Sequence, residues 1–523
     1  MHRYRLIVLL PLALSGAASS GELDRNQRLL PTDPGDNRRF GQILALTEDS
    51  AAVAASGRVI VYERDYPRPG LWGEAAVLRA DAPGFGEQVA LSAAGLAVAA
   101  PDGENGGRVH RYRRDQTGRW QHQETLQSPD AGSGDRFGAA LAAAGEWLAV
   151  GAPGADAGGA VFLYRCRENC TLIQRLTDPQ GEFQADYGAS LALAGDGLAV
   201  GAPARDVTPF QGRIVPAGDL STHAFAIAKG DAPFCGEDVG VVYLYRLSEL
   251  AAGATTPAAT LAPGDAECLQ DYGAALALRD GKLAVGSPGK DVGDTLATGV
   301  VYLYGYDGSR WQPQTILASD RPGEDGRFGA ALAWQGERLL VGAPRETGKR
   351  FRTGVVHRFS QVAEAWQDAP LELAQGRAYD RFGASLAVAG KHLWIGAPGR
   401  RLGDNAEGAV FRTGSTALPP SARFDFDDGR LMLDGVGIWE AGRGWYRAIL
   451  ARDPQGPGWQ FRLQELTPTE APAHPARYLP DSGRLHIPSV RVRFPDGHLD
   501  TFTVDLRQIP DTPSLTFQLE TVR

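Results

Sequence analysis

Residues 137–153 read FGAALAAAGEWLAVGAP, and this stretch decides the fold because close copies of it recur along the chain. It opens with an aromatic–glycine pair and reaches Gly-Ala-Pro fourteen residues after the aromatic residue. Between these two signatures lie alternating apolar residues, a short turn at residues 144–146 and a second apolar run. This order is typical of a β-hairpin, in which a tight turn joins two antiparallel strands.

The aromatic–glycine pair occurs seven times, at Phe40-Gly41, Phe85-Gly86, Phe137-Gly138, Tyr187-Gly188, Tyr272-Gly273, Phe328-Gly329 and Phe382-Gly383. Six units carry Gly-Ala-Pro or a close variant at the same offset, beginning at Ala99, Gly151, Gly201, Gly286, Gly342 and Gly396. The first unit has only Ala54-Ala55-Ser56 there. Because the offset does not vary, one backbone geometry is expected in every unit, which indicates a repeat fold.

Two more strands are expected after each hairpin. The third has the form GAVFLY, at residues 159–164, and the fourth often opens with tryptophan, as at Trp120, Trp311 and Trp366. Four antiparallel strands form one propeller blade, and radial packing of blades leaves only short, protected edges. The sequence therefore predicts an all-β fold with a seven-bladed β-propeller over residues 24–414.

The seventh unit lacks a fourth strand, because the chain runs from residues 408–411 to Pro419-Pro420 without one. A matching segment stands at the other end: residues 27–31 precede Phe40 as residues 174–177 precede Tyr187. We therefore expect residues 26–31 to complete blade seven and tie the two ends of the ring together. Such closure stabilises a repeat array that otherwise has two exposed end units.

Over about residues 26–414 the chain resembles the FG-GAP repeats of integrin α-chain propellers, and more closely the short bacterial form of that repeat in exported proteins. The resemblance implies a propeller that binds ligands on the face where the loops between strands two and three lie. The sequence differs from integrin-like repeats in one respect. Integrin-like repeats place Asp-rich calcium loops between the two signatures, whereas the turns here, such as residues 144–146 and 195–197, offer one carboxylate at most. Calcium needs some six to eight oxygen ligands, so we expect no metal there, and no cofactor.

In a four-stranded blade, the loops between strands two and three share one face with the loops that enter the next blade. The longest of these loops is an insert at residues 204–239, and long loops on a rigid scaffold often carry binding. An insertion without function is an equally open interpretation, and an Asp beside Gly commonly only satisfies turn donors. The candidate binding residues on this face are Asp206, Phe210, His223, Phe225, Phe234, Asp291, Asp294, Asp404 and Glu407.

The four cysteines suggest two disulfides. Cys166 and Cys170 flank the turn between strands three and four of blade three, whereas Cys235 and Cys268 fall in loops on the same face of adjacent blades. We predict the pairs Cys166–Cys170 and Cys235–Cys268, although four cysteines permit three pairings. Disulfides persist in oxidising compartments.

The N-terminus has the pattern of an export signal, with Arg3 and Arg5, an apolar run over residues 6–14 and small residues at 15–18. We expect residues 1–18 to be removed, leaving a protein without a transmembrane segment in the periplasm, at the cell surface or outside the cell. The net charge of -9 and the absence of a sustained basic run argue against a nucleic-acid partner.

After Pro419-Pro420 a second duplication begins, so residues 419–523 form a separate β-domain. Residues 429–431 (GRL) recur as residues 483–485, and Phe461-x-Leu463 recurs as Phe517-x-Leu519. Two copies of a strand-rich unit should pack as a small sandwich or barrel. Its Trp439, Trp445 and Trp459 fit core packing better than a sugar platform.

Motifs for catalysis are missing from the sequence: neither His-Glu-x-x-His nor Gly-x-Ser-x-Gly occurs. The favoured hypothesis is an exported, monomeric binding or adhesion module for a protein or carbohydrate ligand, not an enzyme. Two alternatives stay open: a hydrolase or lyase that uses carboxylates on the propeller face, and a structural scaffold of the cell envelope.

Overall fold

The computed structural model describes residues 21–23, 28–29 and 39–522. Within the last range it leaves out residues 65–71, 104, 131, 157, 183, 207–237, 266–268, 363–364, 402–406, 414–420, 439–443, 455, 457, 470–475, 480–481, 494–498, 511 and 513–514. The export signal, Phe210, His223, Phe225, Phe234, Cys235, Cys268, Asp404 and Trp439 therefore lie outside the described residues.

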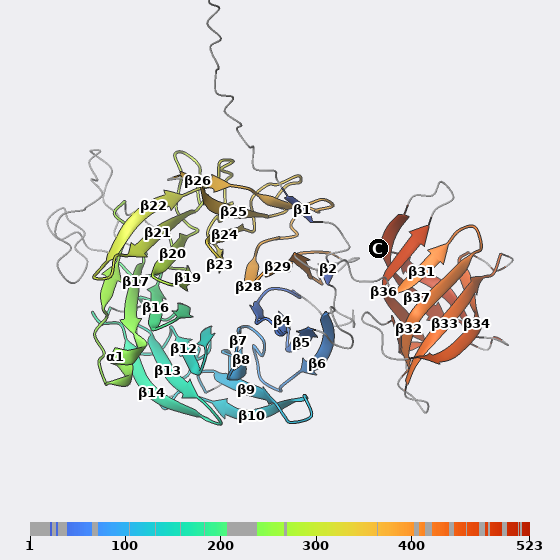
Figure 1. The fold of residues 1–523 in the computed structure, drawn as a ribbon, viewed down its shortest axis with the longest axis horizontal. Coiled ribbons are helices and arrows are strands. Elements are labelled where there is room, and N and C mark those ends of the chain that lie inside the picture. Colours follow the sequence, from blue (N-terminus) through green and yellow to red (C-terminus); the bar gives the residue numbers. More distant parts are fainter. Residues whose placement is uncertain are drawn as a thin grey trace, which may run out of the picture.

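Seven antiparallel sheets stand around a central axis, which confirms the predicted all-β, seven-bladed propeller (Figure 1). Blades one and two comprise β3 (Leu44–Leu46), β4 (Ser50–Ala55), β5 (Arg58–Arg64) and β6 (Trp72–Leu78), then β7 (Val89–Ser92), β8 (Gly95–Ala100), β9 (Arg108–Arg114) and β10 (Trp120–Leu126). Blades three and four comprise β11 (Ala140–Ala144), β12 (Trp147–Ala152), β13 (Ala160–Cys166) and β14 (Cys170–Thr177), then β15 (Ser190–Ala194), β16 (Gly197–Ala202), β17 (Val241–Arg246) and β18 (Ala259–Leu261). Blade five comprises β19 (Ala275–Arg279), β20 (Lys282–Ser287), β21 (Val300–Tyr306) and β22 (Trp311–Leu317).

The N-terminal residues add strands to the last two blades. Blade seven comprises β28 (Ser385–Ala389), β29 (His392–Ala397), β30 (Ala409–Thr413) and, as its outer strand, β2 (Arg28–Leu29). Blade six comprises β23 (Ala331–Gln335), β24 (Arg338–Ala343), β25 (Val355–Val362) and an outer edge split into β26 (Ala365–Asp368) and β27 (Leu371–Leu373). β1 (Gly21–Leu23) pairs in parallel with β27, an extra strand that the repeat pattern did not predict.

The two sequence signatures hold the blades together. All seven aromatic side chains are buried, and the glycines that follow them have φ between 84° and 98°. A Cβ atom on Gly151 of blade three would lie 2.0 Å from the carbonyl oxygen of Gly188 in blade four. The glycine of Gly-Ala-Pro is therefore needed because the backbone of the next blade passes directly over it.

A hydrogen bond between blades repeats around the ring. The N–H of the aromatic residue donates to the carbonyl oxygen of the second residue before the third strand of the preceding blade, as in Tyr187 to Gly158 (2.9 Å). The same bond joins Phe40 of blade one to the carbonyl oxygen of Glu407 in blade seven, at 3.0 Å. Phe85 departs from this pattern, because its N–H bonds to the carbonyl oxygen of Ala82 in its own loop. Blade one has only a tight turn between β4 and β5, so it has no long loop there to supply the acceptor.

Blade four departs from the others at its outer edge. After β17 the chain forms the short helix α1 (Leu247–Ala251), and the outer strand β18 has three residues where β22 has seven. Leu247 and Leu250 pack into the apolar cluster between blades three and four. In blade three, Cys166 and Cys170 form the predicted disulfide between β13 and β14.

The C-terminal strands form a closed barrel, so of the two packings predicted from the sequence, a sandwich or a barrel, the barrel is the one observed. Its strands are β31 (Ala422–Asp425), β32 (Arg430–Ile438), β33 (Gly444–Arg452), β34 (Gln460–Thr469), β35 (Ala476–Leu479), β36 (Arg484–Arg493), β37 (Leu499–Gln508) and β38 (Thr516–Val522). β31 and β35 each pair with both β32 and β36, so they share one position in a seven-membered ring. Phe461 and Phe517 are direct partners across β34 and β38, as a pseudo-two-fold axis through this strand pair requires.

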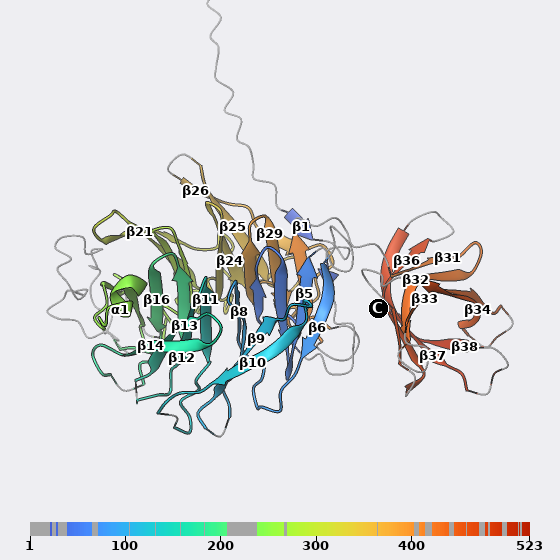
Figure 2. The same ribbon diagram turned by 60° about the horizontal axis from the view of Figure 1, so that its bottom comes forward.

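The barrel lies to one side of the propeller in both views (Figures 1 and 2). Arg477 at the start of β35 donates a 2.9 Å hydrogen bond to the Glu74 carboxylate in β6 of blade one. Trp459 packs against the barrel core, which is formed by Leu431, Leu450, Leu485, Leu506 and their neighbours. In the part of the chain that the structure describes, no helix is long and apolar enough to cross a bilayer.

Candidate functional site

The predicted ligand face carries the loops between strands two and three and the loops that enter the next blade. We call it the loop face. Its loops from blades six and seven lie together, because the Tyr379 N–H bonds to the Arg352 carbonyl oxygen (3.1 Å) and the Gly399 N–H to that of Asp380 (3.1 Å). The hairpin turns of the blades lie on the opposite, turn face.

Three of the predicted acidic residues lie in exposed or half-exposed turns of this face. The Oδ1 atom of Asp206 accepts a hydrogen bond from the Asp238 N–H (2.9 Å), which ties the two ends of the insert together. Asp291 Oδ1 accepts from the Ala297 N–H at 2.7 Å, and Asp294 is exposed. Within the described ranges, no group of three or more His, Cys, Asp or Glu side chains gathers to hold a metal.

Glu407 is buried, with 7% of its surface exposed, and its carbonyl oxygen takes part in the bond that closes the ring. The structure therefore places this residue in the frame of the propeller and not on an open surface. The role of Phe210, His223, Phe225, Phe234 and Asp404 stays a prediction, because they lie outside the described residues.

Ion pairs with buried cations lie beneath the loop face. In three blades the second residue after the Gly-Ala-Pro proline or its equivalent is a cation paired with an Asp: Arg205 with Asp178, Lys290 with Asp265, and Arg400 with Asp380. The carbonyl oxygen of each cation also accepts the N–H of the glycine before strand three. These charges are compensated within the frame, so they support the loops and offer little to a ligand.

Blade six inverts this arrangement. Glu346 stands where blades four, five and seven have the cation, and His357 lies between it and Asp368, with N–O distances of 2.9 and 2.5 Å. Burial of the ring opposes its protonation, but the hydrogen bonds to Asp368 and Glu346 outweigh burial and raise the pKa of His357 to about 9. The imidazole is therefore charged at neutral pH and replaces the missing cation.

A basic and aromatic surface covers blades six and seven on the loop face. Phe351 and Tyr379 are 55% and 57% exposed, and their rings meet edge to face with centroids 5.7 Å apart. The Arg352 guanidinium lies 5.4 Å from the centre of the Phe351 ring. We name this surface the basic-aromatic patch; it comprises Lys349, Arg350, Phe351, Arg352, Arg377, Tyr379, Arg381 and Arg401.

The charge in this patch is strongly one-sided. Of the loop residues that the structure describes, 344–354, 374–381 and 399–401 hold eight basic and two acidic residues, and Asp404 and Glu407 follow in the same loop between β29 and β30. Both acidic residues, Glu346 and Asp380, are buried and paired beneath the surface. Asp325, in the loop that enters blade six, pairs with Arg345 and Arg352, and the patch still keeps an excess of basic side chains on a chain whose net charge is -9.

Sequence reasoning missed this patch, because its residues come from three loops and no long basic run marks it. The available signal was the segment KRFR at residues 349–352, placed between strands two and three of the sixth unit. An aromatic residue inside a short basic segment of a ligand-face loop could have been singled out.

Glu87 and Asp102 form a carboxylate pair at the loop face of blade two. Burial of Glu87, and then its hydrogen bond to Asp102 and the charge of Asp102, raise its pKa above the usual value. The Asp102 side chain is 50% exposed and lies 4.0 Å from the Arg136 guanidinium. This pair is the arrangement on which the catalytic alternative can rest.

Comparisons with known proteins agree with the repeat and add little on function. The FG-GAP repeat family model matches residues 120–164, which run from β10 of blade two to β13 of blade three. No curated protein matches the chain. Among solved structures, the crystal structure of Kluyvelomyces marxianus Hsv2 is 7% identical, with a TM-score of 0.37 over 83% of this chain and 100% of that one.

Proposed function

Because the chain is an FG-GAP β-propeller protein, we propose that it is an exported, non-catalytic binding module whose basic-aromatic patch holds an acidic protein or glycan. The observation that carries the proposal is the contact between Phe351 and Tyr379, two large aromatic side chains that are each more than half exposed. Exposed aromatic residues beside arginine are typical of the centres of binding interfaces.

The side chains around the two rings suggest the chemistry of the ligand. Guanidinium groups bind carboxylate and sulfate oxygens with two parallel hydrogen bonds. The faces of Phe351 and Tyr379 can cover the apolar face of a sugar ring or an aliphatic side chain. Arg350 and Arg381 are exposed. A ligand that combines acidic groups with an apolar surface fits this set best.

The proposal is tested with two acidic polymers as probes, poly-glutamate and polygalacturonate, and the full-length protein. We expect the pair Arg350→Glu and Arg381→Glu to weaken binding at least tenfold and to reduce its dependence on salt. The matched control is Arg119→Glu with Arg423→Glu, which makes the same charge change at exposed sites outside the patch and should alter binding less than twofold. Equal loss in both pairs would mean that only net charge matters, and the patch would be abandoned.

A second pair of variants tests the aromatic contribution. Phe351→Ser with Tyr379→Ser removes the rings and keeps every charge, so a specific site should again lose at least fivefold in affinity. Poly-glutamate and polygalacturonate distinguish protein-like from glycan-like ligands, since the variants should affect the better-bound polymer more. Unchanged affinity of both polymers would reduce the patch to a nonspecific cationic surface.

The catalytic alternative has one specific arrangement in its favour, the pair Glu87 and Asp102, in which one carboxyl group has a raised pKa. Such pairs can share acid and base roles in glycan cleavage. New reducing ends released from polygalacturonate by the wild type, and lost in Glu87→Gln, would replace the binding proposal with a hydrolase or lyase. Intact polymer after long incubation favours binding alone.

A further inference from the structure

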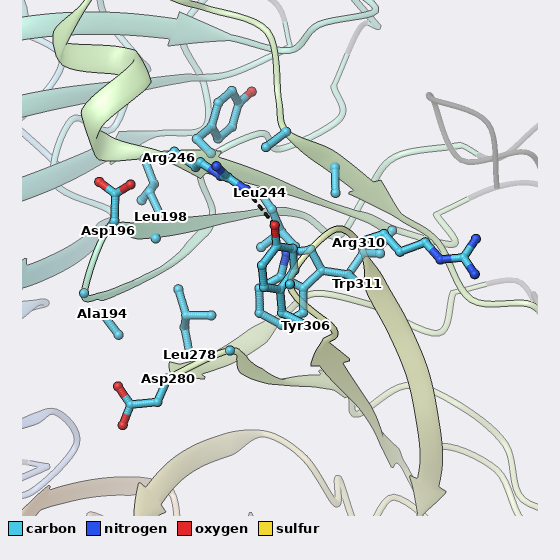
Figure 3. Close-up of a pocket in the computed structure, with 18 of the residues that line it drawn as sticks. Ala194, Asp196, Leu198, Leu244, Arg246, Leu278, Asp280, Tyr306, Arg310 and Trp311 are labelled. Carbon is cyan, nitrogen blue, oxygen red and sulfur yellow. Dashed lines mark hydrogen bonds between the residues drawn. The ribbon is translucent and has the colours of Figure 1, made fainter.

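The turn face carries a cavity of about 580 Å³ between blades four and five, and its charges are balanced (Figure 3). Two acidic and two basic side chains line it, namely Asp196, Asp280, Arg246 and Arg310. Each of them has a partner within the protein, as in the 2.7 Å bond from Arg246 to the Tyr306 hydroxyl group. The cavity therefore favours no particular ligand charge, whereas the loop face does.

The loop face carries charged side chains at the residue before the buried aromatic residue of each repeat. We call this set the charged ring; it comprises Arg39, Arg136, Asp186, Asp271, Arg327 and Arg381, while blade two has Gly84 at this position. Because each member occupies the same place in its blade, together they surround the axis about which the blades stand in Figure 1. All six side chains are exposed or half-exposed.

The backbone at these positions favours glycine. The six charged residues have φ between 54° and 63°, in the left-handed region, and Gly84 has φ of 75°. Residues with a side chain are strained in this region and glycine is not. Six of the seven blades nevertheless have a charged residue here, so the backbone alone does not explain the choice.

One part of the charged ring is basic and continues the basic-aromatic patch. We call it the basic arc: blades six, seven and one contribute Arg327, Arg381 and Arg39 in succession, and Arg381 belongs to the patch. The guanidinium groups of Arg39 and Arg381 make no hydrogen bond or ion pair within the part of the chain that the structure describes. Arg39 therefore extends the basic surface from blade seven to blade one.

A second part, the acidic arc, lies over blades four and five. Burial raises the pKa of Asp186 and of Asp271; Arg136 and Arg327 oppose this shift, and the charge of Asp238 adds to it. Asp238 comes from the loop between strands two and three of blade four. Among the described residues, the carboxylates of Asp186 and Asp238 make no hydrogen bond or ion pair. The acidic arc therefore keeps free acceptor atoms.

Charges are compensated where the two arcs approach each other. Arg327 of the basic arc lies 3.4 Å from Asp271 of the acidic arc. On the other side of the charged ring, Arg136 of blade three lies 4.0 Å from Asp102 of blade two. The centre of each arc keeps its charge, so a ligand of one sign is attracted by one arc and repelled by the other.

We propose that the loop-face ligand is dipolar, with an acidic group on Arg39 and Arg381 and a basic group on Asp186 and Asp238. This inference rests on the proposed function and narrows its ligand to a protein segment that carries both signs of charge. A glycan built from uronic acids has no cation for the acidic arc. Complementary charge of this kind contributes mainly to the choice of partner.

Two decapeptides, EEEEGGKKKK and EEEEGGQQQQ, test the proposal with the full-length protein. They share the acidic half and differ only in the charge of the other half. The wild type should bind the lysine peptide at least fivefold more tightly, because exposed ion pairs contribute modestly and several form together. Raising the salt concentration should reduce this preference.

The variant Asp186→Asn with Asp238→Asn should bring the two affinities within twofold of each other. Asparagine tolerates the left-handed conformation of both positions, so the fold should be kept. The matched control is Asp280→Asn with Glu337→Gln, which removes the same charge on the turn face at side chains that are 83% and 79% exposed. The control should keep the preference for the lysine peptide.

Arg39→Gln tests the basic arc in a blade outside the patch. It should weaken both peptides at least threefold, whereas Arg119→Gln, at an exposed turn-face site, should leave both affinities unchanged. Thermal unfolding midpoints equal to that of the wild type show that each variant is folded.

Equal affinity of the wild type for the two peptides, absence of binding included, would overturn the proposal. A preference that survives Asp186→Asn with Asp238→Asn, or that falls equally in the turn-face control, would do the same, as would unchanged affinity in Arg39→Gln. Tighter binding of polygalacturonate than of EEEEGGKKKK would also reject it, because that polymer has no cation. Failure of the proposed function itself looks different, since Arg350→Glu with Arg381→Glu would then leave poly-glutamate binding unchanged.

Discussion

The amide N–H of Phe40 donates a hydrogen bond to the carbonyl oxygen of Glu407, 3.0 Å away, and this bond joins the first blade to the seventh. Beside it, β2 covers the outer edge of β30, with Leu29 opposite Val410. Leu29 is 2% exposed and packs with Phe40 and Trp394. The ring is thus closed both by the repeated interblade bond and by a strand from the N-terminal segment.

Leu29→Ala should therefore weaken the whole propeller. Loss of a buried leucine side chain costs about 2–5 kcal/mol, including the cavity left behind. The midpoint of urea unfolding, followed by tryptophan fluorescence, should fall accordingly. Leu172→Ala in the outer strand of blade three is the control, since Leu172 is 37% exposed and its loss should cost less than about 1 kcal/mol. Equal effects would mean that β2 contributes no closure.

Gly342→Ala should be poorly tolerated. A Cβ atom there would lie 2.1 Å from the carbonyl oxygen of Gly383 in the next blade, so the two backbones would have to separate. We expect a loss of at least about 2 kcal/mol in thermal or urea unfolding. At the equivalent position blade two already has Ala99, where Ala99→Gly should cost only about 1 kcal/mol. A smaller effect for Gly342→Ala than for Ala99→Gly would contradict the role of the glycine.

The repeat could be predicted because each signature residue has the same local structural role in every blade. An aromatic residue, a glycine at φ near 90° and a small residue under the next blade recur at fixed spacing, so their pattern is visible in the sequence. The pairing of β1 with β27 has no such periodic mark. The helix α1 and the shortened strand β18 occur in one unit only, so no repeated pattern marks them.

The candidate sites were harder to predict, since each joins residues from loops that are distant in sequence. The basic-aromatic patch depends on the contact between Phe351 and Tyr379, which come from different loops. Only the interblade packing brings these residues together. Acidic residues in the loops were easier to notice, yet Asp206 and Asp291 mostly bond to their own loops.

The disulfide pattern can be checked by mass spectrometry of a protease digest prepared without reducing agent. Cys166 is 2% exposed and already bonded to Cys170 across the β13–β14 turn, so it is out of reach of the other cysteines. We expect one internal bond within residues 166–170 and one peptide that links Cys235 to Cys268. A fragment joining Cys170 to Cys235 would contradict both pairs.

The buried His357 should make stability fall at alkaline pH. Its pKa in the folded protein, about 9, lies above the ordinary value of 6.5 because the hydrogen bonds to Asp368 and Glu346 outweigh burial. A raised pKa stabilises the fold fully below pH 6.5, and this contribution disappears as the pH rises through 9. The loss amounts to about 3 kcal/mol, at roughly 1.4 kcal/mol for each tenfold change in proton affinity.

His357→Tyr provides the comparison, because blades four and five have Tyr243 and Tyr302 at this position and each donates its hydroxyl to an Asp. The variant leaves Glu346 without its cation, so it should be less stable than the wild type at pH 6. Between pH 6 and pH 9.5, however, the wild type should lose about 3 kcal/mol more unfolding free energy than the variant does. Parallel pH profiles, or an NMR titration of His357 with a midpoint below 7, would show that the imidazole is not held in its charged form between the two carboxylates.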